Sequence, residues 1–187
     1  MIPNAKWIRP AQTTGDVCPV YSKQFSFFSS PNQSLSSVAH ATLSVTAMGV
    51  YEASLNGKRI GDFVLAPGWT SYRHRLQVQT YDVTELLSSE NELSILVGKG
   101  WYRSPLAWPD EAHRQQKAQI PAGLIALLTI TYTDGSTQLL PTGADWSAYE
   151  SNVRFSEIYD GETYDAAFDP SSAPIAIAEF DGPSDTL

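Results

Sequence analysis

The chain has 187 residues, 42% of them hydrophobic and 11% aromatic, which is enough for one globular domain with a sizeable core. Its formal net charge is -8 and it has no Lys/Arg run, so nucleic acids and anionic membranes are poor partners. A lone cysteine, Cys18, excludes an intrachain disulfide and a cysteine-based metal site. The N-terminus lacks a leader pattern and no apolar run approaches about 18 residues, so we expect a cytoplasmic protein.

Short strands are predicted along the first half of the chain. Residues 1–20 contain Pro3, Pro10 and Pro19 and are expected to form an extended lead-in, because proline disfavours helices and central strands. The Asn56-Gly57 pair predicts a tight hairpin turn, because both residues tolerate positive φ. Five strands are predicted here, the first three from period-2 alternation of side chains: 21–28, 38–45, 50–55, 58–65 and 73–83. A single helical turn is expected to follow at 84–87.

The second half continues this pattern but includes one long irregular segment. Residues 98–119 are rich in Trp, Pro, Arg and His and show no period, which is typical of a functional or mobile loop. Residues 169–187 are dominated by Pro, Ser, Ala, Asp and Gly, which indicates a linker or a truncated strand. Strands are predicted over 91–97, 124–133, 136–140 and 153–158, with Asp134-Gly135 as a second hairpin turn.

Together these elements predict an all-β protein. About nine or ten short strands, tight turns and no convincing amphipathic helix favour an antiparallel jelly-roll-type β-sandwich. The sandwich is expected to span residues 21–168, between the lead-in at 1–20 and a linker or truncated tail at 169–187. The absence of βαβ alternation argues against a Rossmann-type or barrel enzyme fold.

Familiar catalytic signatures are absent from the sequence. It contains no G-x-G-x-x-G, phosphate-binding loop, H-E-x-x-H or G-x-S-x-G, and its histidines are scattered. Asp160, Glu162 and Asp165 form one acidic cluster. Such carboxylates can cap turns, bind a hard cation such as Ca²⁺, or act as the paired carboxylates of a glycosidase. Turn capping is favoured, and no catalytic residues are expected in this chain.

Aromatic side chains in loops give the stronger functional signal. Sugar rings stack their apolar faces on Trp or Tyr, while adjacent polar groups bind the hydroxyls. The aromatic residues at predicted loops or strand ends are Trp69, Tyr72, Trp101, Tyr102 and Trp108. The tryptophans can instead plug the end of a sandwich core or contact a partner protein, and these interpretations stay open.

Several motifs resemble the N-terminal β-sandwich region of bacterial α-L-rhamnosidases and follow that region's order. They are AKWIRP near the start, GVYEASLNGKRIGDFVLAPGWTSYRHRLQVQTYDVTELL at 49–87, GKGWYRSPLAW at 98–108 and SEIYDGETYDA at 156–166. In that family the catalytic carboxylates lie in a separate α-helical barrel domain, and no segment here resembles that barrel. The resemblance therefore implies a non-catalytic accessory domain of a glycoside hydrolase.

The resemblance also implies a ligand and a partner. We expect the domain to recognise L-rhamnose or rhamnosylated glycosides and to lie beside the catalytic (α/α) barrel of its parent chain. The residues predicted to bind the sugar are Asn56, Asp62, Trp101, Tyr102 and Trp108. Related modules bind L-rhamnose, some of them through a Ca²⁺ ion, but Leu55 stands where such a Ca²⁺ site would favour an acidic neighbour of Asn56. The alternative is a structural domain that packs on the barrel or mediates dimerisation.

Overall fold

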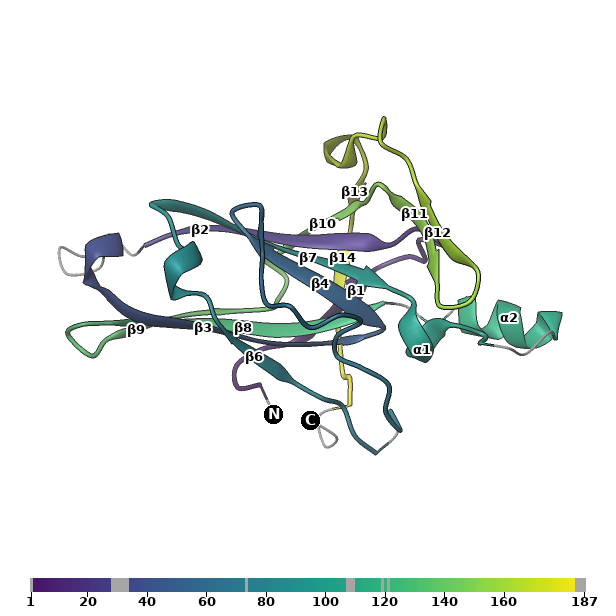
Figure 1. The fold of residues 1–187 in the computed structure, drawn as a ribbon, viewed down its shortest axis with the longest axis horizontal. Helices are drawn as coiled ribbons and strands as arrows, with labels where there is room; N and C mark the ends of the chain where they lie inside the picture. The colour runs from purple at the N-terminus through teal and green to yellow at the C-terminus, as the bar shows by residue number, and fades with distance from the viewer. Residues whose placement is uncertain are drawn as a thin grey trace.

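The computed structural model describes residues 2–27, 34–72, 74–106, 110–118, 120 and 122–183. These residues form two six-stranded antiparallel sheets that face each other, with a separate two-stranded hairpin at one end (Figure 1). The predicted all-β antiparallel sandwich is confirmed. Within the described residues, no helix is long and apolar enough to cross a membrane.

Each sheet combines strands from both halves of the chain. The first sheet contains β1 (Trp7–Pro10), β3 (Val38–Met48), β6 (Gln79–Asp82), β8 (Gly123–Tyr132), β9 (Thr137–Pro141) and β14 (Ile177–Phe180). The second sheet contains β2 (Pro19–Ser26), β4 (Val50–Leu55), β5 (Lys58–Arg59), β7 (Glu90–Gly98), β10 (Ser147–Glu150) and β13 (Pro174–Ile175). The separate hairpin consists of β11 (Val153–Glu157) and β12 (Gly161–Tyr164).

The main core lies between the two sheets. Leu43 of β3 and Leu128 of β8 are cross-strand partners, and both belong to the same buried cluster as Ile95 of β7. Each such aliphatic side chain stabilises the fold by about 1.5–3 kcal/mol when it is fully buried. Tyr21 is also fully buried there, and its hydroxyl donates a hydrogen bond of 2.7 Å to the carbonyl of Ala122. The inward-facing residues of the predicted strands therefore form one continuous core.

Strand β8 is buried on both of its faces. Leu128 and Ile130 face the main core, whereas Ile125 and Leu127 belong to a second cluster with Trp7. A strand covered on both sides needs an almost continuous apolar sequence, which explains the run that begins at Gly123.

Two predicted hairpin turns are confirmed. Asn56 and Gly57 have φ values of 56° and 75°, the positive values that a two-residue turn between β4 and β5 requires. Gly135, with φ of 84°, closes the turn between β8 and β9. The predicted helical turn near residue 84 is also present, as a 3-10 helix over Thr84–Leu86.

Two predicted strands are much shorter than expected. The return strand at 58–65 is limited to Lys58–Arg59, because Gly61 and Leu65 adopt left-handed backbone conformations. The strand at 73–83 is limited to Gln79–Asp82, because the amides of His74 and Arg75 bond back to the carbonyl of Ser71 in a turn. The segment between them is therefore a loop that is exposed over residues 61–65, whereas Ala66 is buried and forms an isolated bridge with Tyr51.

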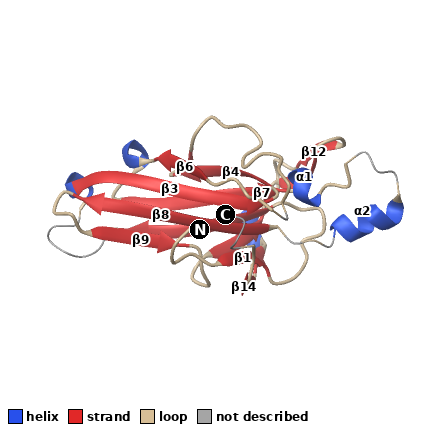
Figure 2. Cartoon of the chain, turned by 90° about the horizontal axis from the view of Figure 1, so that it is seen from below, coloured by secondary structure: helices blue, strands red, loops and turns tan. Residues whose placement is uncertain are grey.

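The expectation of an irregular segment over 98–119 is wrong in part. It contains two helices, α1 (Gly100–Arg103) and α2 (Glu111–Ala118), which lie beyond the strand ends at one end of the sandwich (Figure 2). Helix α2 has the sequence EAHRQQKA, rich in residues with high helix propensity. It lacks an apolar stripe, so hydrophobic periodicity gave no sign of it.

The predicted lead-in and tail both take part in the sandwich. Strand β1 pairs with β14 over four residues, from Trp7↔Phe180 to Pro10↔Ile177, and β13 pairs with β10. Trp7 is buried against Phe180, with ring centroids 6.0 Å apart. Proline is tolerated in the edge strand β13 and at the end of β1, beyond the Ile8↔Leu124 pair with β8, because one side of the backbone there needs no ladder hydrogen bonds. The sandwich therefore extends at both ends beyond 21–168.

Alkaline solution is expected to destabilise the domain partly through Cys18. Burial raises the pKa of its thiol to about 11, although Arg103 and Lys99 oppose the shift. An unfolded thiol ionises near pH 8.5, so this contribution to stability is full below about pH 8.5 and is lost as the pH rises towards 11. Urea denaturation at about pH 8 and about pH 10 measures this loss. The Cys18→Ala variant should lose less stability between these two pH values, and an equal loss would contradict the assignment.

Candidate functional site

Four aromatic side chains gather at the end of the sandwich that bears α1. We call Trp69, Tyr72, Trp101 and Tyr102 the aromatic cluster. The rings of Trp69 and Trp101 are stacked, with centroids 6.0 Å apart and planes 5° apart. Tyr72 meets Tyr102 edge to face, with centroids 5.1 Å apart. Trp69 is 67% exposed, so the cluster presents a large aromatic surface to solvent.

One glycine positions helix α1, which supplies half of the aromatic cluster. Gly100 begins α1 with φ of 51°, and a Cβ atom there would lie 2.9 Å from the backbone nitrogen of Val50. Only glycine permits both this conformation and this close approach. Helix α1 therefore starts against β4, and Trp101 and Tyr102 follow at once.

Hydrogen bonds hold α1 and the neighbouring loop in place. The Nε atom of Arg103, a buried residue, donates to the carbonyl of Ile120 at 2.5 Å, and Lys117 Nζ donates to the carbonyl of Tyr102 at 3.2 Å. In the loop before β6, the Gln79 amide donates to the Pro67 carbonyl at 3.2 Å. The Tyr72 hydroxyl donates to the Gly68 carbonyl at 3.3 Å. Both halves of the aromatic cluster thus rest on an anchored backbone.

A cavity of about 510 Å³ opens beside Tyr72 and Tyr102. Met48 and Leu76 supply apolar walls, whereas Ser71 and Lys117 supply polar groups. Burial raises the pKa of Tyr72 to about 12 and also raises that of Tyr102, so both phenols are protonated at neutral pH. The cavity thus combines aromatic and apolar walls with hydroxyl and ammonium donors, in the size range of small-molecule sites.

The structure brings together only part of the predicted ligand set. Trp101 and Tyr102 belong to the aromatic cluster, whereas Trp108 lies outside the described residues. Asn56 follows the far end of β4, because Val50 pairs with Gly98 next to α1 whereas Leu55 pairs with Leu93. Asp62 is exposed in the loop after β5. Contact of these residues with a sugar stays a prediction.

The Asn56 side chain is engaged inside the protein. Its Nδ2 donates to the Leu86 carbonyl and to Asn91 Oδ1, both at 2.9 Å. Its Oδ1 accepts a hydrogen bond of 2.9 Å from the Glu92 amide. The amide group thus joins the hairpin turn to β7, which is a structural role that the sequence alone did not indicate.

The acidic cluster is dispersed along one hairpin. Asp160 lies in the turn before β12, Glu162 is exposed on β12, and Asp165 accepts a hydrogen bond of 3.0 Å from the Ala167 amide. Across the described ranges, no three His, Cys, Asp or Glu side chains come close enough to hold a metal ion. Turn formation accounts for the role of Asp165.

Sequence reasoning missed some contributors to the cluster and its cavity. Trp69 and Tyr72 stood out as loop aromatics but were not among the predicted ligand residues. Their place in the loop segment APGWTSY was the available signal. Lys117 and Ser71 carried no such signal, because only the fold of the chain brings them to Tyr102 and Tyr72.

Comparison with known families gives a match over most of the chain. Residues 36–173 match the family described as "Alpha-L-rhamnosidase N-terminal domain". An alpha-L-rhamnosidase of Streptomyces avermitilis is 42% identical over 130 residues, which cover 69% of this chain. The match covers only 12% of that enzyme, so the chain is much shorter than this relative.

Solved structures share the same fold. Native alfa-L-rhamnosidase from Aspergillus terreus superposes on 99% of this chain and 22% of its own, with a TM-score of 0.83 and 32% identity. The Streptomyces avermitilis alpha-L-rhamnosidase complexed with L-rhamnose covers 88% of this chain and 16% of its own, with a TM-score of 0.72 and 33% identity.

Proposed function

The chain belongs to the family of alpha-L-rhamnosidase N-terminal domains, and from this membership we propose that it is a carbohydrate-recognition domain without catalytic residues. Its ligands are L-rhamnose and rhamnosylated glycosides, which a catalytic barrel domain of the parent protein hydrolyses. The relative from Streptomyces avermitilis was solved in complex with L-rhamnose, which supports this choice of sugar.

The aromatic cluster is the observation that supports this proposal most directly. Trp69 is exposed and is backed by the parallel ring of Trp101, so it offers a fixed flat surface for one face of a sugar ring. L-rhamnose is a 6-deoxy sugar, and its methyl group needs an apolar contact. Met48 and Leu76 provide such a surface in the adjacent cavity, while Lys117 and Ser71 can donate hydrogen bonds to hydroxyls.

A structural function is the second candidate, and a different surface supports it. Phe63, Val64 and Leu65 are consecutive in the loop after β5, and they are 48%, 68% and 44% exposed. Adjacent exposed apolar side chains are typical of surfaces that pack on another protein or domain. This loop would then contact the catalytic barrel of the parent chain, or a second copy of the domain.

Replacing Trp69 by alanine is expected to weaken the binding of L-rhamnose by about tenfold, which corresponds to 1.4 kcal/mol. The loss follows from removal of the stacking surface, whereas stability should change little because the side chain is exposed. Isothermal titration calorimetry with L-rhamnose and a rhamnosylated flavonoid, with and without Ca²⁺, measures the effect.

The Phe63→Ser variant is the matched control for this experiment. It removes an exposed aromatic ring from the neighbouring apolar loop and should leave sugar binding unchanged. In the parent enzyme it should instead weaken contact with the catalytic domain if the second candidate is correct. If the Trp69→Ala variant bound L-rhamnose with unchanged affinity, the aromatic cluster would not be the sugar site. The same conclusion would follow if millimolar sugar gave neither binding heat nor NMR shifts with the unmodified chain.

A further inference from the structure

A second groove lies on the outer face of the second sheet, away from the aromatic cluster. Its floor is formed by the outward residues of two paired strands, β2 and β7. Ser22 is the cross-strand partner of Ser94, and Gln24 is the partner of Glu92. The residues between them on β7, such as Leu93 and Ile95, point to the main core. The groove is thus separated from the core by one layer of backbone.

The segment that follows β10 covers one side of this floor. Tyr149 is the penultimate residue of β10, Asn152 precedes β11, Val153 begins β11, and Tyr164 ends β12. All four residues line the groove together with Pro170 of a 3-10 helix over Pro170–Ser172. The groove has a volume of about 510 Å³, within the range of ligand sites and sufficient for one or two sugar rings.

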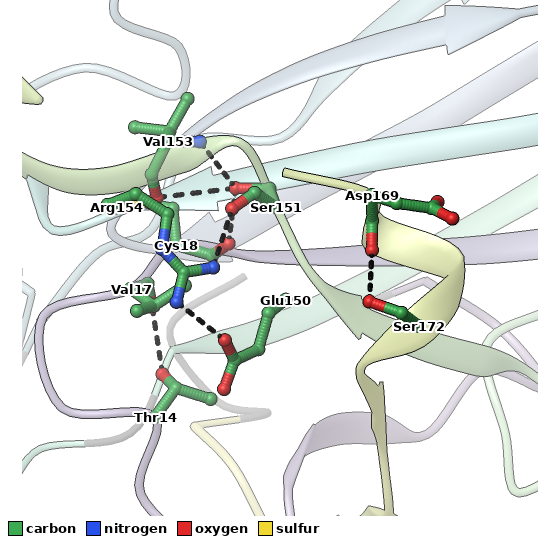
Figure 3. Close-up of polar contacts among 9 residues, drawn as sticks. All are labelled: Thr14, Val17, Cys18, Glu150, Ser151, Val153, Arg154, Asp169 and Ser172. Atoms are coloured by element: carbon green, nitrogen blue, oxygen red, sulfur yellow. Dashed lines mark hydrogen bonds and ion pairs between the residues drawn. The ribbon is translucent and has the colours of Figure 1, made fainter. Parts of the chain in front are cut away.

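A hydrogen-bond network fixes this covering segment to Cys18, the residue that precedes β2 (Figure 3). The Ser151 hydroxyl donates to the Cys18 carbonyl at 2.6 Å and accepts from the Val153 amide at 3.1 Å. Arg154 donates to the Ser151 carbonyl and also forms an ion pair of 2.7 Å with Glu150. Ser151 is buried, so the two hydrogen bonds of its hydroxyl are protected from water. The groove is therefore preformed and does not depend on a ligand for its shape.

Further bonds fix the far end of the segment. The Asn152 amide donates to the carbonyls of Asp165 at 2.8 Å and Phe168 at 2.7 Å, and the Arg154 guanidinium lies 4.1 Å from the Phe168 ring centroid. The Ser172 hydroxyl donates to the Asp169 carbonyl at 2.7 Å. Tyr164 is held at the edge of the groove by its strand pairing with Val153, yet it remains 61% exposed.

The groove offers side chains that are free to bind a ligand. In the part of the chain that the structure describes, the side chains of Gln24, Ser94, Tyr149 and Tyr164 make no hydrogen bond. Two of them are phenol rings, which can stack on the apolar face of a sugar. The other two are an amide and a hydroxyl, which can both donate and accept hydrogen bonds to hydroxyl groups.

The charge of the groove limits the ligand class. Among its described lining residues, Glu92 is the one charged side chain, and its carboxylate accepts a hydrogen bond of 2.7 Å from Ser22. Without an Arg or Lys in the lining, an anionic ligand such as a phosphate or a uronate finds no counter-charge. We propose that this groove is a second binding site of the domain, for a neutral saccharide. Binding in the groove depends on the residues that line the groove and not on sugar binding at the aromatic cluster.

NMR titration of the 187-residue chain tests this proposal. The probes are L-rhamnose, D-glucose and D-galactose as neutral sugars and D-glucuronate as the charged counterpart. We expect at least one neutral sugar to shift the amide signals of Ser94 and Tyr164, and D-glucuronate to shift neither. The Tyr164→Ala variant should weaken this binding about tenfold, whereas Tyr164→Phe, which retains the ring, should stay within about threefold.

Tyr159 provides the matched control, because it lies in the same hairpin, is 66% exposed and does not line the groove. The Tyr159→Ala variant should bind the sugar like the unmodified chain. Equal affinity of Tyr164→Ala and Tyr159→Ala would overturn the proposal. Shifts confined to Trp69 and Trp101 would overturn it while leaving the proposed function intact. Loss of binding in Tyr164→Ala but not in Trp69→Ala would support the groove and count against the aromatic cluster.

Discussion

Replacing Gly49 by alanine is expected to destabilise the domain by about 3–5 kcal/mol. Gly49 joins β3 to β4 with φ of 147°, a conformation that residues with a Cβ rarely adopt. A Cβ atom there would lie 2.2 Å from the Gly98 carbonyl oxygen. That oxygen belongs to the backbone of β7, which is paired with β4 and cannot move without breaking the ladder. Urea denaturation followed by tryptophan fluorescence measures the change in the free energy of unfolding.

The Gly135→Ala variant separates the two causes of this effect. Gly135 also has a positive φ, of 84°, but a Cβ atom there meets nothing within 4 Å. Its replacement should therefore cost only the backbone strain, about 1 kcal/mol. The difference between the two variants reports the clash with β7 together with the rarer backbone conformation of Gly49. Equal destabilisation in both would show that the close approach of the strands at Gly49 contributes nothing.

Replacing Asn56 by glycine is expected to lower the free energy of unfolding by about 2–4 kcal/mol. Glycine keeps the positive φ of the turn, so the loss comes from the hydrogen bonds of the amide and not from the backbone. Those bonds satisfy the Leu86 carbonyl, Asn91 Oδ1 and the Glu92 amide. Urea denaturation again gives the change, and sugar titration of the same variant shows whether binding follows folding.

The Asn56→Asp variant tests the direction of the same bonds. Aspartate retains the oxygen that accepts from the Glu92 amide but places a second oxygen opposite the Leu86 carbonyl and Asn91 Oδ1. We expect it to be at least as unstable as Asn56→Gly at neutral pH and to recover in part below about pH 4, where a protonated carboxyl can donate. An Asn56→Asp variant that folds normally but no longer binds L-rhamnose would support the predicted role of Asn56 as a ligand residue.

Side-chain periodicity and turn chemistry predicted most of the sandwich. Alternation identified β2, β3 and β4 to within a few residues, and Asn56-Gly57 identified their hairpin. These signals are local, because each depends on residues that are adjacent in the chain. Strand β1 was not predicted because it is short and contains proline, and β14 was anticipated only as a linker or truncated strand because it follows a low-complexity run. Their pairing depends on a partner more than 160 residues away.

The candidate site was less predictable than the fold. Loop aromatics could be recognised as functional candidates from their type and position, and Trp101 and Tyr102 do meet Trp69 and Tyr72. The sequence could not indicate which loops meet at the same end of the sandwich. Asn56 illustrates this limit. The start of β4 lies beside α1, whereas Asn56 follows the end of β4. The length of β4, about 20 Å, therefore separates Asn56 from α1.

The pairing of β1 with β14 has a consequence for how the domain can be connected to other polypeptides. Trp7 and Phe180 are neighbours across one ladder, so the chain enters and leaves the sandwich at almost the same point. A loop of a host protein would need to open by only about 4.8 Å, one strand spacing, to accommodate both connections. A domain with this connection can be inserted into a loop of a longer chain without moving the two ends of that loop far apart.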